Sequence, residues 1–189
     1  MQRRELKRGG HNQLRIIAGK WRGRRIEFPA AAQLRPTPNR VRETLFNWLR
    51  DRIEGSACLD LFAGSGALGI EALSRGASSS LFVEQDRKLA ENLRVQLDYL
   101  GDSSRIVQTS ASKFIDSADD ELFDIVFADP PFQMQIDELL DRLRFKLRLN
   151  GLLYVEQAIE TGLPEVKWGD WHRVGKAGSV CYGLLQLRR

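Results

Sequence analysis

The sequence has little of what several protein classes require. Its 189 residues include two cysteines, Cys58 and Cys181, and two histidines, and their spacing matches no metal-binding or disulfide framework. No window approaches 18 uncharged apolar residues, so we expect no membrane-spanning helix. The first residues are basic and lack an apolar core, so we expect no secretory signal. These absences favour a cytoplasmic globular protein with buried, reduced thiols and no bound metal.

Positive charge is concentrated near the N-terminus. Residues 1–50 carry 13 Lys and Arg against three acids, whereas the other 139 residues carry 16 against 22. A basic arm on a mildly acidic body favours a polyanionic partner. For residues 3–8 a solubilising tail is an equal alternative, but residues 15–25 interleave basic with apolar side chains. We therefore expect the polyanion to contact Arg15, Lys20, Arg22, Arg24 and Arg25.

The N-terminal part predicts a small hairpin followed by a helix. Short β-prone runs at 14–18 and 24–28 flank a basic, glycine-bounded tip, and no periodicity precedes them. Thr37 and Pro38 then suit the N-cap and the first residue of a helix. The apolar stripe of that helix comprises Val41, Leu45, Trp48 and Leu49. We expect residues 1–34 to form a basic arm and hairpin, and residues 35–189 to form the main domain.

Strands and helices alternate in the main domain. This order predicts an α/β fold with a doubly wound, mostly parallel sheet and right-handed crossovers. The last two strands flank a Gly-Lys-Ala-Gly turn, which indicates a closing antiparallel hairpin. The expected strands are 58–62, 80–83, 105–108, 123–128, 152–156, 171–174 and 180–187, with helices at 67–75, 86–100, 111–118 and 134–148.

A glycine-rich turn follows the first of these strands. Gly64 and Gly66 lack the Cβ atoms that would block a ligand lying across the backbone. The glycines alone also fit a dinucleotide site. Asp60, however, precedes the loop, where a carboxylate repels a pyrophosphate and accepts from an ammonium group. Glu84 ends the next strand and suits the two hydroxyls of a ribose. The two acids favour a cationic aminoacyl nucleoside over a dinucleotide, and chance acids on a structural turn are the remaining alternative.

A second motif, Asp129-Pro130-Pro131-Phe132, stands at the carboxyl end of the 123–128 strand. Ligands of open α/β sheets bind at this edge. An exocyclic base amine is a poor nucleophile because its lone pair is delocalised. The Asp129 carboxylate and the Pro130 carbonyl can each accept one of its N–H groups, and Phe132 offers a face for stacking the base. A rigid strand exit with an incidental acid is the alternative, but it needs no aromatic residue at the fourth position.

Taken together, these motifs resemble a known family. The block Arg35-Pro36-Thr37, the block 41–49 (Val-Arg-Glu-Thr-Leu-Phe-Asn-Trp-Leu), the glycine loop and residues 129–132 are similar to those of the bacterial 16S ribosomal RNA guanine-N2 methyltransferases. That family modifies guanosine 966 in conventional rRNA numbering. The resemblance covers residues 14–187, and the block 41–49 is its specific part.

The resemblance implies a Rossmann-like methyltransferase fold of seven strands, with the last one antiparallel. It also implies S-adenosyl-L-methionine as cofactor, and as substrate the 16S rRNA of the small ribosomal subunit or an assembly intermediate. The basic hairpin then becomes an RNA-binding element of a monomeric enzyme. The catalytic segment is Asp129, Pro130, Pro131 and Phe132, and the expected cofactor-binding residues are Thr37, Arg40, Asp60, Ala63, Gly64, Ser65, Gly66, Glu84, Gln85, Ser110 and Ala111.

The sequence departs from the pattern at one position of the cofactor site. Many methyltransferases carry Asp or Asn after the third strand of the sheet to bind adenine. Here residues 109–111 offer only hydroxyls and the backbone of Ala111. Three other functions remain open: an adenine-N6 DNA methyltransferase, a dinucleotide-dependent oxidoreductase, and a non-catalytic RNA-binding assembly factor.

Overall fold

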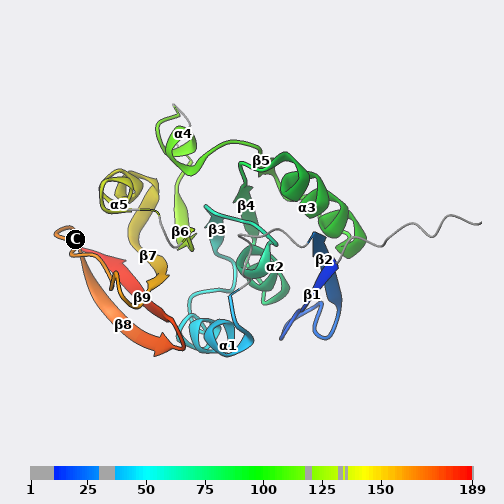
Figure 1. Cartoon of the computed structure of the whole chain (residues 1–189), viewed down its shortest axis with the longest axis horizontal. Helices are drawn as coiled ribbons and strands as arrows, with labels where there is room; N and C mark the ends of the chain where they lie inside the picture. Colours follow the sequence, from blue (N-terminus) through cyan, green and yellow to red (C-terminus); the bar gives the residue numbers. More distant parts are fainter. Residues whose placement is uncertain (1–10, 30–36, 118–120, 132–133, 135, 189) are drawn as a thin grey trace, which may run out of the picture.

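The computed structural model describes residues 11–29, 37–117, 121–131, 134 and 136–188. It consists of a small two-stranded sheet, a seven-stranded sheet and helices on both of its faces (Figure 1). The elements are β1 (His11–Arg15), β2 (Arg25–Pro29), α1 (Asn39–Trp48), β3 (Ala57–Asp60), α2 (Ala67–Ser74), β4 (Ser79–Val83), α3 (Arg87–Leu100), β5 (Ile106–Val107), α4 (Ala111–Ile115), β6 (Phe123–Ala128), α5 (Asp137–Leu143), a 3-10 turn (Arg144–Lys146), β7 (Leu147–Ala158), β8 (Gly169–Ala177) and β9 (Val180–Leu187).

The large sheet confirms the predicted fold class. Its strand order is β5-β4-β3-β6-β7-β9-β8. Strands β5, β4, β3, β6 and β7 pair in parallel, whereas β9 is antiparallel to both of its neighbours. The strand order reverses direction at β3, from which the chain first builds outward to β4 and β5 and then returns to β6. This reversal is the topological switch point at which ligands of doubly wound sheets bind.

The strands present alternate side chains to two cores. One face of the sheet packs Leu59, Val126 and Leu153 against α4 and α5. The opposite face packs Cys58 and Ile125 against α1 and α2. Alternation with a period of two on a sheet covered on both sides is what a buried parallel sheet requires. Both cysteines are buried and free. Within the described residues, no helix has the length and apolar character needed to cross a membrane.

The N-terminal hairpin packs on the body of the molecule. Leu14, Ile16, Trp21, Ile26 and Phe28 are buried in one cluster with side chains of α2, β4 and α3. At the tip, a Cβ on Gly19 would lie 1.7 Å from the carbonyl oxygen of Ser74 at the end of α2, and the φ of Gly19 is +82°. Only glycine fits so close an approach in this backbone conformation. The blue hairpin accordingly lies beside α2 and α3 in Figure 1.

Several predicted boundaries were wrong, and three of them have a clear physical reason. Strand β1 begins at His11 and ends at Arg15, because the N–H groups of Ile17 and Ala18 donate to Glu71 and no longer to a strand. Pro38 takes the N-cap position of α1, and Thr37 makes no capping bond. The helix predicted for 134–148 is shorter in the structure, where α5 ends at Leu143. It ends early because β7 already begins at Leu147, which pairs with Phe123 of the neighbouring strand β6.

Candidate active site

The glycine loop joins β3 to α2 at the carboxyl edge of the sheet. Gly64 and Gly66 have φ values of 52° and 77°, which L side chains rarely adopt. A Cβ on Gly66 would lie 2.5 Å from Leu93 Cδ1, so α3 also requires this glycine. A Cβ on Gly69 would lie 2.3 Å from the ring of Phe82, which requires glycine where α2 crosses β4. Ala63 and Ser65 are buried in the same loop. The sequence therefore forms the tight strand-to-helix turn that the motif predicts.

Asp60 is buried at the end of β3, directly beside this loop. Its Oδ2 accepts the N–H of Gly69 at 2.9 Å, at the N-terminal part of α2. Burial raises the pKa of Asp60 to about 7, the hydrogen bond from Gly69 lowers it, and the charge of Glu84 raises it. A buried carboxyl of this kind is stabilised in its ionised form by a cationic ligand.

Glu84 follows β4 and contacts the same loop. One carboxylate oxygen accepts the N–H of Gly64 at 2.7 Å, and the other accepts the N–H of Asp86 at 2.7 Å. Both oxygens are thereby held at a fixed orientation, and each keeps a second lone pair for a ligand hydroxyl. Asp60 and Glu84 end adjacent parallel strands, so the structure brings the two predicted acids to one edge of the sheet.

Asp129 follows β6, the strand on the other side of β3. Its carboxylate is half-buried, and Oδ2 accepts the hydroxyl of Thr37 at 3.0 Å. Burial and the neighbouring charges of Glu156 and Asp60 raise the pKa of Asp129 well above its ordinary value, whereas the Thr37 hydrogen bond lowers it. Pro130 is buried and Pro131 is exposed. Phe132 lies outside the described residues.

Glu156 on β7 is a site residue that the sequence analysis missed. The pairing of β6 with β7 ends at Ala128 and Val155, which places Glu156 next to Asp129. Glu156 is buried, accepts the hydroxyl of Tyr154 at 2.7 Å, and has a pKa raised by its burial. The available signal was an acid at the end of the apolar run 152–156, since the ends of neighbouring parallel strands meet.

These four carboxyl groups form an acidic edge with no basic partner among the described residues. None of Asp60, Glu84, Asp129 and Glu156 takes part in a salt bridge of the described chain. Two of them are nearly inaccessible to solvent, with exposed fractions of 3% for Asp60 and for Glu156. Buried carboxylates without a partner are costly, so the edge is suited to a ligand that carries positive charge.

The other predicted cofactor residues lie around this edge at different depths. Ala111 is buried at the start of α4, and Ser110 is its N-cap, accepting the N–H of Lys113 at 3.4 Å. Both follow β5, so they border the edge beyond Glu84. Gln85 and Arg40 are exposed, and the Arg40 carbonyl accepts the hydroxyl of Thr44.

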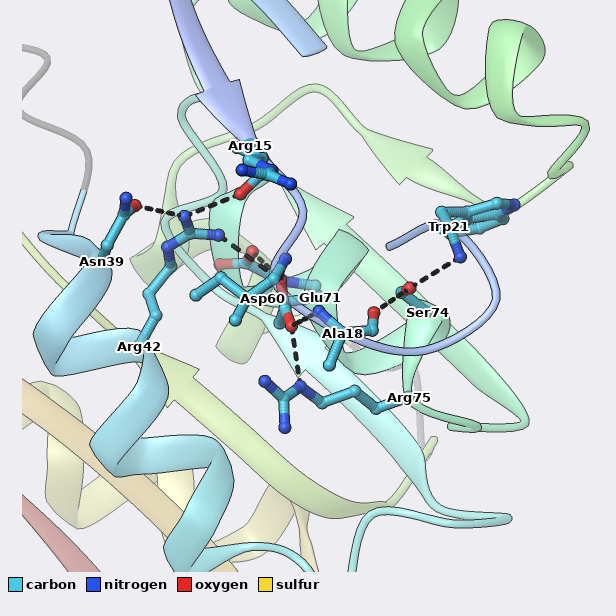
Figure 2. Close-up of polar contacts among 11 residues, drawn as sticks. Arg15, Ala18, Trp21, Asn39, Arg42, Asp60, Glu71, Ser74 and Arg75 are labelled. Carbon is cyan, nitrogen blue, oxygen red and sulfur yellow. Dashed lines mark hydrogen bonds and ion pairs between the residues drawn. The ribbon is translucent and has the colours of Figure 1, made fainter. Parts of the chain in front are cut away.

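A buried ion pair joins α1 to α2, and both of its residues also bind the backbone of the hairpin (Figure 2). Arg42 and Glu71 are fully buried, with 3.5 Å between Nη1 and Oε2. Glu71 also accepts the backbone N–H groups of Ile17 and Ala18, at 2.8 and 3.0 Å, and the side chain of Arg75 at 2.7 Å. The Arg42 Nη2 donates to the carbonyl of Arg15 and to the side chain of Asn39. We call Arg42, Glu71 and these partners the hub.

The hub was not foreseen in the sequence. Arg42 falls within the block 41–49, but nothing in that pattern identifies Glu71 as its partner. The docking at Ser74, drawn in Figure 2, adds to it: Trp21 donates its backbone N–H to the Ser74 hydroxyl, which donates in turn to Ala18. The hairpin is thus fixed to α2 by backbone hydrogen bonds as well as by apolar packing.

All five predicted basic contact residues are exposed on the docked hairpin. Lys20 lies over the ring of Trp21, and Arg24 lies 5.8 Å from the ring centroid of Tyr99 on α3. Tyr99 is itself 62% exposed. The apolar residues between the basic ones face the core, so the charges are directed outward. The exposed basic side chains are Arg15, Lys20, Arg22, Arg24 and Arg25.

The chain matches a family model along most of its length. Residues 14–186 match the model described as Conserved hypothetical protein 95. The chain is 44% identical over 183 residues to ribosomal RNA small subunit methyltransferase D of Escherichia coli, covering 94% of this chain and 91% of that protein. It is 41% identical to the protein of the same name from Haemophilus influenzae, covering 92% and 94%.

Solved structures agree in fold. The Escherichia coli protein yhhF is 44% identical and superposes with a TM-score of 0.83, covering 93% of this chain and 98% of that one. An RNA methyltransferase from Salinibacter ruber, solved with S-adenosyl-L-homocysteine, shares 15% identity and a TM-score of 0.64 over 81% and 94% of the chains. The likeness to the second is one of fold alone. The first, described as a putative methyltransferase, supports a Rossmann-like methyltransferase fold for this sheet. By sequence and fold, the chain belongs to the Conserved hypothetical protein 95 family and to the family of ribosomal RNA small subunit methyltransferase D.

Proposed function

We propose that this protein transfers a methyl group from S-adenosyl-L-methionine to the exocyclic N2 of a guanine in 16S rRNA, with guanosine 966 as the expected target. The observation that carries the chemistry is Asp129, held at the sheet edge with the three further acids and the glycine loop. The relatives named ribosomal RNA small subunit methyltransferase D support the substrate class.

The acidic edge fits the cofactor. In this proposal Asp60 binds the ammonium group and Glu84 binds the ribose hydroxyls, while the loop residues Ala63, Gly64, Ser65 and Gly66 pack against the bound group. When bound, S-adenosyl-L-methionine supplies an electrophilic methyl group on a positively charged sulfur. Its two positive charges offset the unpartnered carboxylates of this edge. The remaining proposed cofactor contacts are Arg40, Gln85, Ser110 and Ala111, whereas Thr37 hydrogen-bonds to Asp129.

Asp129 and Pro130 activate the base. Each presents an oxygen that accepts one N–H of the amine, which directs the nitrogen lone pair toward the methyl group. Pro131 follows a buried proline and accepts the N–H of Met134 at 2.8 Å, so the backbone after Asp129 is held in place. In this proposal Asp129 would take the proton that the nitrogen loses on methylation. Alignment of this kind contributes several kcal/mol to a displacement reaction. Phe132 is proposed as the stacking surface for the base.

The RNA contact is assigned to the hairpin. We propose residues 1–34 as an RNA-binding arm and residues 35–189 as the catalytic domain. In this proposal the enzyme acts as a cytoplasmic monomer on the small ribosomal subunit or an assembly intermediate. The outward-facing Arg and Lys side chains neutralise phosphates, and the fixed docking of the hairpin on α2 sets its distance from Asp129.

One experiment decides base, atom and substrate together. Labelled methyl transfer is compared on undermethylated small subunits, naked 16S rRNA and DNA, followed by nucleoside analysis. We expect N2-methylguanosine from rRNA substrates and no product from DNA. The variant Asp129→Ala is expected to lose transfer while binding S-adenosyl-L-methionine within a few-fold of the wild type. Labelled N6-methyladenine in DNA, or undiminished transfer by Asp129→Ala, would contradict the proposal.

A further inference from the structure

Thr37 occupies a buried position that a helix cap does not explain. It is 3% exposed, and α1 begins after it with Pro38 as N-cap and no side-chain capping bond. Its hydroxyl donates to Oδ2 of Asp129 at 3.0 Å, across 92 positions of sequence. Within the described residues, no hydrogen bond reaches the other carboxylate oxygen, Oδ1. One oxygen of Asp129 is therefore fixed and the other remains available to a substrate.

Three features hold Thr37 at this place. Pro38 restricts the residue before it to an extended conformation. Phe46 of α1 packs against Phe127 of β6, with 6.0 Å between ring centroids, two residues before Asp129. Arg42 of α1 is anchored to Glu71. Phe46 thus holds α1 to β6 and Arg42 holds it to α2, so the backbone that carries Thr37 is fixed at the start of a buried helix.

The charges around Asp129 make this hydrogen bond functionally important. Glu156 and Tyr154 face Asp129 from β7 and Asp60 faces it from β3, and both acids raise its pKa, as burial does. Thr37 acts in the opposite direction, since a donor stabilises the ionised carboxylate. An ionised carboxylate is a strong acceptor at both oxygens, so one can accept from Thr37 and the other from a base amine.

We propose that Thr37 is a positioning residue for methyl transfer, whose hydroxyl orients the Asp129 carboxylate so that Oδ1 accepts the N–H of the target amine. The inference rests on the proposed function, and it assigns Thr37 to the methyl acceptor and not to the cofactor. Thr37 does not touch the reacting atoms. It acts through Asp129, by orienting that carboxyl group and by favouring its ionised form.

The test compares Thr37→Val, which removes the hydroxyl at nearly constant volume, with Thr37→Ser, which keeps it. Thr44→Val is the matched control, because it removes a threonine hydroxyl of the following helix, α1, that donates to the Arg40 carbonyl. We expect Thr37→Val to lower kcat roughly 10- to 100-fold, the range of one charge-assisted hydrogen bond. The KM for S-adenosyl-L-methionine is expected to change less than threefold, and Thr37→Ser and Thr44→Val to stay within threefold of wild type in kcat.

Two readouts separate positioning from a structural role. The acidic limb of the pH–rate profile is expected at higher pH in Thr37→Val, because the loss of the donor raises the pKa of Asp129. The ¹³C resonance of the Asp129 carboxyl, assigned with Asp129→Asn, should titrate at correspondingly higher pH in the cofactor-free protein. Thr37→Ala gives the same comparison if valine disturbs the backbone.

Distinct outcomes would overturn the inference and the function. A wild-type protein that methylates no rRNA would remove the proposed function, and this inference with it. An active wild type with unchanged kcat and pH profile in Thr37→Val would overturn the inference alone. A variant that raises the KM for S-adenosyl-L-methionine at unchanged kcat would also overturn it and return Thr37 to the cofactor site.

Discussion

At the scale of residues, the site is governed by carboxyl groups removed from water. Asp60, Asp129 and Glu156 all have pKa values raised first by burial, and they further influence one another through charge. Such groups destabilise the folded protein when they ionise without a partner. The same groups give a cationic ligand a large electrostatic advantage on binding. The acidic edge therefore lowers the stability of the ligand-free protein and raises its affinity for a cationic ligand, a trade-off that is common at functional sites.

Asp60→Asn tests this exchange through pH. The pKa of Asp60 is about 7 in the folded protein, above its ordinary value of 3.8. Between about pH 4 and pH 7 the folded state holds a proton that the unfolded state has lost, so wild-type stability falls as pH rises through this window. Asparagine keeps an acceptor for Gly69 and does not ionise. We expect Asp60→Asn to gain about 2–4 kcal/mol in free energy of unfolding relative to wild type between pH 4 and pH 8.

Urea unfolding of the cofactor-free protein at several pH values measures this difference. Asp170→Asn is the control of opposite sign, because the hydrogen bond from Arg188 lowers the pKa of Asp170. That control should lose stability relative to wild type as pH rises through the acidic range. A difference between Asp60→Asn and wild type that does not vary with pH would contradict the buried-acid account of the site.

At the scale of elements, the hub fixes three segments on one sheet face. Glu71 of α2 accepts from α1, from the turn after β1 and from Arg75, and all of these donors depend on a single buried carboxylate. Removing one partner of a buried pair leaves the other uncompensated and costs about 3–5 kcal/mol. The hub therefore holds the hairpin and α1 in their positions on α2.

Arg42→Met tests the hub. We expect it to lower the free energy of unfolding by about 3–5 kcal/mol, because Glu71 loses an ion pair and Arg15 loses a donor to its carbonyl. The matched control is Arg87→Met, which removes an exposed arginine paired with Glu91 on α3 at 3.7 Å and should cost less than about 0.5 kcal/mol. Chemical denaturation measures both, and equal losses in the two variants would contradict a special role for the hub.

The elements also show where sequence patterns suffice. The glycine loop, Asp60, Glu84 and Asp129 were predicted because each follows its own apolar strand, and parallel strands bring their carboxyl ends together whatever the long-range packing. Glu71 and the partner of Thr37 could not be predicted. Their roles depend on contacts between helices and strands that lie tens of residues apart, and the residues themselves stand in ordinary helical or capping patterns. The end of β1 was misplaced for the same reason, since Glu71 accepts the N–H groups of Ile17 and Ala18.

At the scale of the whole molecule, charge is divided between an outward basic hairpin and an acidic sheet edge. The basic hairpin attracts a polyanion, whereas negative charge at the sheet edge disfavours one. We expect neutralisation of Arg22, Arg24 and Arg25 to glutamine to weaken 16S rRNA binding roughly 10- to 100-fold near physiological salt. The slope of log K against log salt should become shallower by about 2, as expected for three lost phosphate contacts.

A variant of equal charge change provides the control. Lys167, Arg173 and Lys176 are exposed on or before β8, at the opposite end of the sheet from the hairpin (Figure 1). Their replacement by glutamine lowers the net charge by the same amount. Binding titrations at several salt concentrations should show a much smaller effect for this variant. Equal weakening by both triple variants would assign the binding to net charge and not to the hairpin.

The two outer strands of the large sheet have a further consequence for how copies of the protein behave at high concentration. An outer strand exposes unpaired backbone groups on which another chain can pair and start an aggregate. Here β5 is only two residues long, and β8 shifts register between Trp171 and Arg173 and carries the exposed charges of Arg173 and Lys176. A short strand offers too few hydrogen bonds, and a charged, irregular one repels its own copy. Both edge strands are thereby protected against pairing with another copy of the protein at high concentration.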